Sequence, residues 1–152
     1  MADGSGLEAL EPWIENYLRK LKPGERSKVA RKIGIMLRRA NSERILANTQ
    51  PDGSAMEPRK TKKGKRSRKG PMFPKAGRLR NMRVRAAADG VTVDFVRLVA
   101  GTAAVHHWGL VDKVDARVPN SIKVRYPARR LLGFSAADRE AIMDEVLKWV
   151  GD

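Results

Sequence analysis

Cysteine is absent from this 152-residue sequence, which excludes disulfide bonds and thiolate metal sites. Long apolar runs are absent too, since none approaches the roughly 20 residues that a membrane-spanning helix requires. The first residues, MADGSGLEALEP, are acidic and lack the basic and apolar parts of a signal peptide. We therefore expect no membrane partner and a protein that acts in the cytoplasm in which it is made.

Histidine is scarce, and the two histidines, His106 and His107, are neighbours in the sequence. On a helix, adjacent side chains point about 100° apart, so this pair cannot share a metal ion in the usual i, i+4 geometry. No glycine-rich phosphate-binding loop is present, and the aspartates are dispersed. The sequence predicts a protein that is not an enzyme, with no catalytic residue, metal site or cofactor. A small nuclease or peptidase that uses His106 or His107 is the open alternative.

Positive charge is abundant, with a formal net charge of +15. Such a field favours polyanions or acidic protein surfaces as partners. The charge is densest over residues 59–69, where eight of eleven residues are basic and none is acidic. We take these eight as the candidate partner-binding residues: Arg59, Lys60, Lys62, Lys63, Lys65, Arg66, Arg68 and Lys69.

This basic run belongs to a predicted flexible arm over about residues 51–75, because so charged a segment cannot bury enough apolar surface to fold alone. Three interpretations compete. The arm orders against an acidic partner, serves as a localisation or nucleic-acid-binding segment, or is a solvated loop. The first is favoured, since long loops inside compact domains are usually functional. The run also lacks the interleaved aromatic residues on which nucleic-acid bases stack.

Two helices are predicted in the first third of the chain. Apolar residues recur at helical spacing over residues 7–21, and Pro23-Gly24 interrupts the pattern. A second helix then extends to about residue 48, which gives an N-terminal helical hairpin. The basic face of the second helix is interpreted as solvated, with nucleic-acid contact as the alternative.

A β-hairpin is predicted over residues 80–96, because alternating apolar residues flank the turn signal Asp89-Gly90. Alternation over residues 121–126 predicts another strand, which Pro127 ends. We expect this strand to join the hairpin in one small antiparallel sheet.

A buried short helix is predicted over about residues 97–109, stopped by Gly109, and a C-terminal helix over about residues 136–150, capped by Ser135. The apolar face of the last helix is expected to pack on its own sheet, with packing on another copy as the alternative. Together these elements predict an α+β fold in a single domain over residues 1–152.

Three segments carry a resemblance to a known family. They are ANTQPDGS at residues 47–54 followed by Pro58-Arg59, VHHWGL at residues 105–110, and VRYPARRLLGFS at residues 124–135. In this order and spacing the chain resembles the phage virion morphogenesis, or tail completion, family of Mu-like and related contractile-tailed phages.

The resemblance implies a structural virion protein of the head–tail junction, or neck, that is needed for tail completion and for joining the tail to the DNA-filled head. It implies a ring, commonly sixfold, around the DNA channel. The family has no catalytic residues to transfer, and its motif positions are expected to shape the fold and the contacts between subunits. The candidates for subunit contact are Arg129, Arg130, His106, His107 and Trp108.

The expected partners follow from that resemblance. They are further copies of the chain in a homo-oligomeric ring, expected to be a hexamer, adjacent neck, tail-terminator, sheath or tube proteins, and the genomic DNA that passes through the channel. The expected location is the virion, after assembly in the cytoplasm of the bacterial host. A nucleic-acid-binding protein that uses the basic arm is the alternative function.

Overall fold

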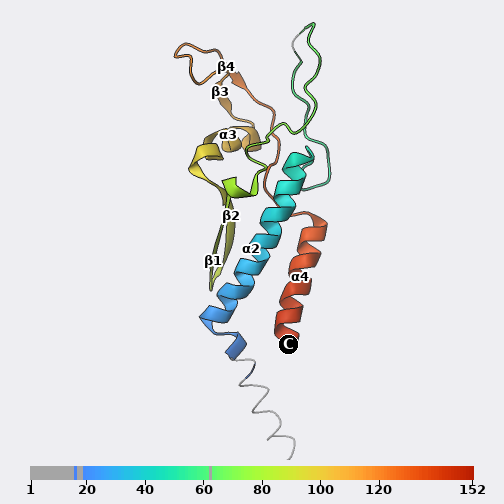
Figure 1. The fold of residues 1–152 in the computed structure, drawn as a ribbon, viewed down its shortest axis with the longest axis vertical. Helices are drawn as coiled ribbons and strands as arrows, with labels where there is room; N and C mark the ends of the chain where they lie inside the picture. The colour runs from blue at the N-terminus through green and yellow to red at the C-terminus, as the bar shows by residue number, and fades with distance from the viewer. Residues whose placement is uncertain (1–15, 17–18, 62) are drawn as a thin grey trace, which may run out of the picture.

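The structure is a computed structural model that describes residues 16, 19–61 and 63–152. It combines helices with two small antiparallel sheets, so the predicted α+β class is confirmed (Figure 1). The elements in chain order are α2 (Pro23–Leu46), the short 3-10 helix η1 (Leu79–Asn81), β1 (Met82–Ala87), β2 (Gly90–Phe95), α3 (Arg97–Trp108), β3 (Val111–Lys113), β4 (Lys123–Arg125) and α4 (Ala136–Gly151).

The predicted N-terminal hairpin is described only in its second helix. Most of the expected first helix, over residues 7–21, lies outside the described residues, so that part stays a prediction. The second helix is confirmed as α2, whose first residue is Pro23. Proline suits this position, because its missing amide hydrogen would have had no partner within the helix.

The β1–β2 hairpin confirms the prediction for residues 80–96, with its turn at residues 88–89, one residue earlier than expected. Val84 lies opposite Val93 and Ala86 opposite Val91, so these apolar side chains share one face. That face meets α2 at Gly34, where a Cβ atom would come closer than 3.0 Å to side-chain carbons of Val84 and Val91. Glycine therefore allows α2 to lie directly on the hairpin.

The strand predicted at residues 121–126 is present as β4, but it pairs with β3 and not with the hairpin. The cause lies at Gly109, which ends α3 in the left-handed conformation with φ of 68°. A Cβ atom there would also lie 3.0 Å from the Ala128 backbone nitrogen. The chain reverses at this glycine, and Val111 then pairs with Arg125 in a separate sheet.

The helix predicted at residues 97–109 is confirmed as α3, but it is less buried than expected. Only Val99 and Ala103 are fully buried, whereas Leu98 is 81% exposed. One side of α3 packs on the core and the other sides remain open, because no further element of the described chain covers them.

The core forms where the end of α2 meets segments far apart in the sequence. Ile45 of α2 and Leu131 are its largest fully buried side chains. Met56 is also buried, and Phe73 packs against the same cluster, so both ends of the predicted 51–75 arm contribute to the core. The longest exposed stretch of the arm is correspondingly shorter and covers residues 57–61 and 63–71 among those described.

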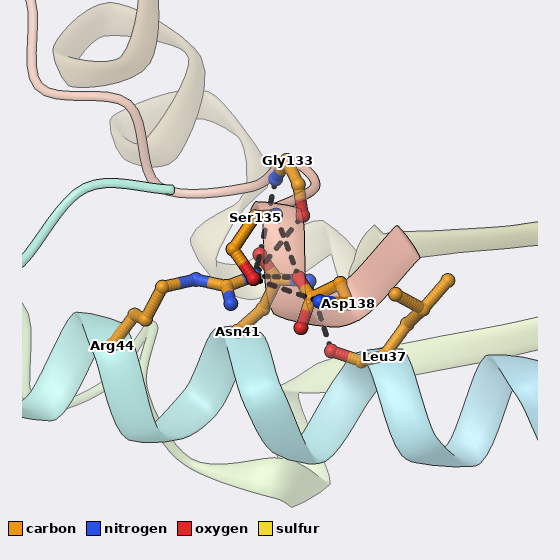
Figure 2. A network of polar contacts seen from close by, with 6 residues as sticks. All are labelled: Leu37, Asn41, Arg44, Gly133, Ser135 and Asp138. Atoms are coloured by element: carbon orange, nitrogen blue, oxygen red, sulfur yellow. Dashed lines mark hydrogen bonds and ion pairs between the residues drawn. The ribbon is translucent and has the colours of Figure 1, made fainter. Parts of the chain in front are cut away.

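The C-terminal helix α4 begins with a reciprocal cap. The Ser135 hydroxyl accepts from the Asp138 amide, and the Asp138 carboxylate accepts from the Ser135 amide, both at 3.0 Å. Figure 2 shows how this cap meets α2: the Arg44 guanidinium lies 2.8 Å from the Asp138 carboxylate, and the Asn41 side-chain oxygen accepts from the Gly133 amide.

This polar network directs α4 onto α2, whereas the sequence led us to expect packing on the sheet. A second ion pair, Lys32 with Glu145, lies further along the same two helices. Figure 1 shows α4 on one side of α2 and the hairpin on the other. Much of the apolar surface of α4 therefore stays exposed, including Met143 and Leu147.

The Asp138 carboxylate makes stability depend on pH. Burial by itself raises the pKa of Asp138, but hydrogen bonds from Arg44 and Ser135 outweigh it and hold the pKa below its ordinary value of 3.8. A group with a lowered pKa in the folded state stabilises the fold above its unfolded pKa, and the contribution disappears as pH falls through the folded value.

We expect Asp138→Asn to lower the free energy of unfolding at neutral pH by about 1–3 kcal/mol, because Arg44 loses its buried carboxylate partner. Urea denaturation from pH 7 to about pH 3 checks this, and the gap between wild type and variant should narrow as the Asp138 carboxylate is protonated. If the free energies of unfolding of wild type and variant changed with pH in parallel, the assigned role of Asp138 would be contradicted.

Candidate functional site

The basic arm extends beyond the end of α2 as a long loop (Figure 1). Residues 57–61 and 63–71 are all exposed, with a turn at Lys63-Gly64. Lys62, one of the eight candidate residues, lies outside the described residues. The other seven candidates have exposed positions on the arm: Arg59, Lys60, Lys63, Lys65, Arg66, Arg68 and Lys69.

Three side chains hold the two ends of this loop together, and we call Asn48, Arg59 and Arg129 the arm base. The Asn48 carboxamide donates to the Gly70 carbonyl at 3.1 Å and accepts from the Met72 amide at 2.8 Å. Across the loop, the Arg59 guanidinium donates to the Met72 carbonyl. Asn48 thereby fixes the returning end of the arm to the end of α2.

Arg129 fixes the outgoing end. Its side chain is only 5% exposed, and its guanidinium donates to the carbonyls of Glu57 at 2.6 Å and Pro58 at 3.2 Å. Burial lowers the pKa of Arg129, and the Arg59 cation adds to that effect, while Glu57 opposes it. The buried guanidinium is thus used within its own chain, whereas the sequence suggested it as a donor to a neighbour.

The two histidines lie at the end of α3, where they orient the segment that carries Arg129. The His106 Nδ1 atom lies 3.5 Å from the Arg129 guanidinium, and the His107 Nδ1 atom accepts from the Leu131 amide at 3.1 Å. Because arginine can only donate, Nδ1 of His106 faces it as an acceptor and the proton belongs on Nε2.

The pKa values of both histidines fit these neutral, hydrogen-bonded roles. Burial lowers the pKa of His106, and the cations of Arg129 and Arg59 lower it further. Burial and Arg130 lower the pKa of His107 as well. Each imidazole is therefore uncharged at neutral pH, which leaves Nδ1 free to accept.

Arg130 and Trp108 form an exposed pair beside this buried region. The Arg130 guanidinium lies 4.7 Å from the centre of the Trp108 ring, and Trp108 is 60% exposed. The guanidinium cation is attracted electrostatically to the face of the ring, and both residues are exposed to solvent. Of the five predicted subunit-contact residues, these two present the most accessible surface.

Sequence reasoning missed Asn48 and Gln50, both inside the ANTQPDGS segment. Asn48 has a φ of 56°, a left-handed conformation that asparagine tolerates better than most residues. The Gln50 side-chain oxygen accepts from the Arg130 amide at 2.8 Å. The signal for both was a polar amide beside a turn, where such side chains commonly replace backbone partners.

Neither a membrane span nor a metal site emerges from the described part of the chain. None of its helices combines the length and apolar character needed to cross a bilayer. Within the same residues, no group of three or more histidine, aspartate or glutamate side chains is arranged to hold a metal ion.

Comparisons with known proteins agree with the resemblance carried by the sequence motifs. The model of the phage virion morphogenesis family matches residues 6–151. The chain is also similar to tail completion protein S of Escherichia phage P2, with 29% identity over 147 residues that cover 93% of this chain and 95% of that protein. No solved structure matches the fold.

Proposed function

Because the chain belongs to the phage virion morphogenesis family, we propose that it completes the phage tail and joins it to the DNA-filled head. The observation that carries this proposal is the similarity to tail completion protein S, which extends over nearly the full length of both chains. In this proposal the chain is a structural component of the virion at the head–tail junction, assembled in the cytoplasm of the host and without catalytic activity.

At that junction the chain forms a homo-oligomeric ring, a hexamer, around the channel through which the genomic DNA passes. Its neighbours are the adjacent neck, tail-terminator, sheath or tube proteins. The extent of exposed apolar surface supports self-assembly, since Trp108, Ile122 and Leu147 are each at least 60% exposed. Such surface on a small domain is typical of proteins that bury it against a partner.

The basic arm binds an acidic surface of a neighbouring subunit or ring in this proposal. The arm base fixes both of its ends, so the exposed cations of residues 59–69 are presented together on one loop. Fixing the ends lowers the entropy that the loop loses when it docks.

DNA binding by the arm is a second candidate function. It is favoured by the exposure of the arm's cations, for which no ion pair with an acidic residue is found among the described side chains. Contacts of this kind act through phosphate neutralisation and weaken steeply as salt concentration rises.

Light scattering of the purified chain, with and without short duplex DNA, separates the two functions. We expect a discrete oligomer whose mass does not change with DNA at about 0.5 M salt, where surface charges are strongly screened. A monomer that forms a DNA complex resistant to that salt concentration would favour the DNA-binding function and contradict the ring.

A further inference from the structure

An open apolar groove of about 620 Å³ lies between β2, α3 and residues 132–134. Val93 and Phe95 of β2 and Ala104 of α3 contribute to its lining. Two aromatic residues of the lining, Trp108 and Phe134, are 60% and 56% exposed. Within the described chain, no element fills this groove, so its apolar lining is open to a partner.

A second exposed apolar surface lies on α4. Met143, Leu147 and Val150 are 58%, 60% and 40% exposed, and their spacing places them within an arc of about 60° on the helix. The ion pairs of α4 with α2 involve Asp138 and Glu145, which lie on the other side of the helix. We call Met143, Leu147 and Val150 the α4 apolar face.

The charged residues around the two surfaces have a small net excess of opposite sign. Arg83 and Arg97 line the groove, and its single acidic residue, Asp94, is paired with Arg85 at 2.5 Å and with Arg83 at 3.5 Å. Residues 136–152 hold five acidic and two basic residues, of which Asp138 and Glu145 are paired with α2, so that Glu140, Asp144 and Asp152 remain against Arg139 and Lys148. Exposed Glu140 lies beside the α4 apolar face, with Arg139 on the opposite flank.

We propose that the α4 apolar face of one copy of this chain docks into the groove of the next copy. A chain cannot fill its own groove, because α4 is fixed to α2 on the side away from the hairpin that contributes β2 to the groove (Figure 1). The contact joins two different surfaces, and repeating it produces a ring when the rotation closes. The inference rests on the self-assembly proposed above and names the surfaces that produce it.

Cysteine cross-linking tests this contact without background from native thiols, since the natural chain has no cysteine. Ala104→Cys marks the groove and Met143→Cys marks the α4 apolar face, and both positions are exposed. The two full-length variants are purified separately, mixed, and treated with a short bis-maleimide. We expect a cross-linked dimer that contains one copy of each variant.

The matched control is Lys148→Cys, an exposed position on α4 that lies about 140° around the helix from Met143. Mixed with Ala104→Cys, it should give at least tenfold less cross-linked dimer. Equal yields from the two mixtures would overturn the proposal, as would self-cross-linking of Ala104→Cys alone, which would mean that two grooves face each other.

A charge exchange gives an independent readout. Arg97→Glu should raise the dissociation constant for self-association at least tenfold, and adding Glu140→Arg in the same chain should restore most of the loss, since every interface then carries the exchanged pair. The wild-type chain could still assemble when Glu140→Arg does not restore self-association and the mixed variants give no cross-linked dimer. In that case the contact between the groove and the α4 apolar face is wrong, and the ring proposal stands. If the chain does not self-associate at all, both fail.

Discussion

Replacing Gly34 with leucine should lower the free energy of unfolding by about 3 kcal/mol or more. Even the first carbon of a side chain at this position would come closer than 3.0 Å to carbons of Val84 and Val91. Valine side chains branch at Cβ and have few alternative rotamers, so they cannot move aside cheaply. To accept leucine, α2 and the β1–β2 hairpin must separate, and the apolar contact between them is lost.

Gly101→Ala is the comparison variant, because Gly101 also lies inside a helix, but a Cβ atom added there would meet no atom within 4 Å outside its chain neighbours and its own helix backbone. Alanine there should stabilise the protein by up to about 1 kcal/mol through helix propensity. Chemical denaturation of both variants measures these two changes in the free energy of unfolding. A Gly34→Leu protein as stable as wild type would show that α2 does not lie directly on the hairpin.

Replacing Arg129 with methionine should lower the free energy of unfolding by about 2–4 kcal/mol. Methionine preserves much of the side-chain volume, so the main loss is the set of hydrogen bonds to the Glu57 and Pro58 carbonyls. Both carbonyls belong to the outgoing end of the arm. The variant should therefore release that end even under conditions in which the rest of the domain is folded.

Arg130→Met provides the comparison, since the neighbouring arginine is exposed and lies over Trp108. Arg130→Met should change the free energy of unfolding by no more than about 0.5 kcal/mol. A protease that cleaves after arginine, with the products identified by mass, gives a local readout at Arg59, which follows Pro58 directly, and we expect cleavage there to be at least tenfold faster in Arg129→Met than in Arg130→Met. Equal cleavage rates would contradict the role of Arg129 in the arm base.

The different environments of these two arginines could not be predicted from the sequence. Arg129 and Arg130 are adjacent and chemically identical, and the sequence proposed the same role for both. In the structure one guanidinium is buried against backbone carbonyls and the other is exposed over an aromatic ring. They differ because the carbonyls of Glu57 and Pro58, more than 70 residues earlier in the chain, lie beside Arg129 in the fold. No local sequence pattern predicts a contact between residues so far apart.

The elements that short, local sequence patterns specify were predicted correctly. The β1–β2 hairpin follows from alternation around a turn, and the Ser135 cap of α4 follows from side chains three residues apart. The pairing of β4 was not predictable in the same way, because its partner β3 is only three residues long. A strand that short shows no alternation to detect, and its existence depends on the chain reversal at Gly109.

The position of α4 was missed for a related reason. Its apolar residues suggested packing on the sheet, but the contacts that fix it are polar, chiefly Arg44 with Asp138. Each of these residues has an ordinary local explanation, a basic residue near a helix end and an acidic residue in a first turn. That the two form an ion pair becomes visible only when the helices are placed side by side.

The most direct measurement of the central claim is electron microscopy of lysates from a phage in which the gene for this chain is deleted. We expect DNA-filled heads and separate tails that fail to join, with infectious particles restored when the wild-type chain is supplied from a plasmid. Intact, infectious particles in the absence of the chain would contradict the proposed role in tail completion.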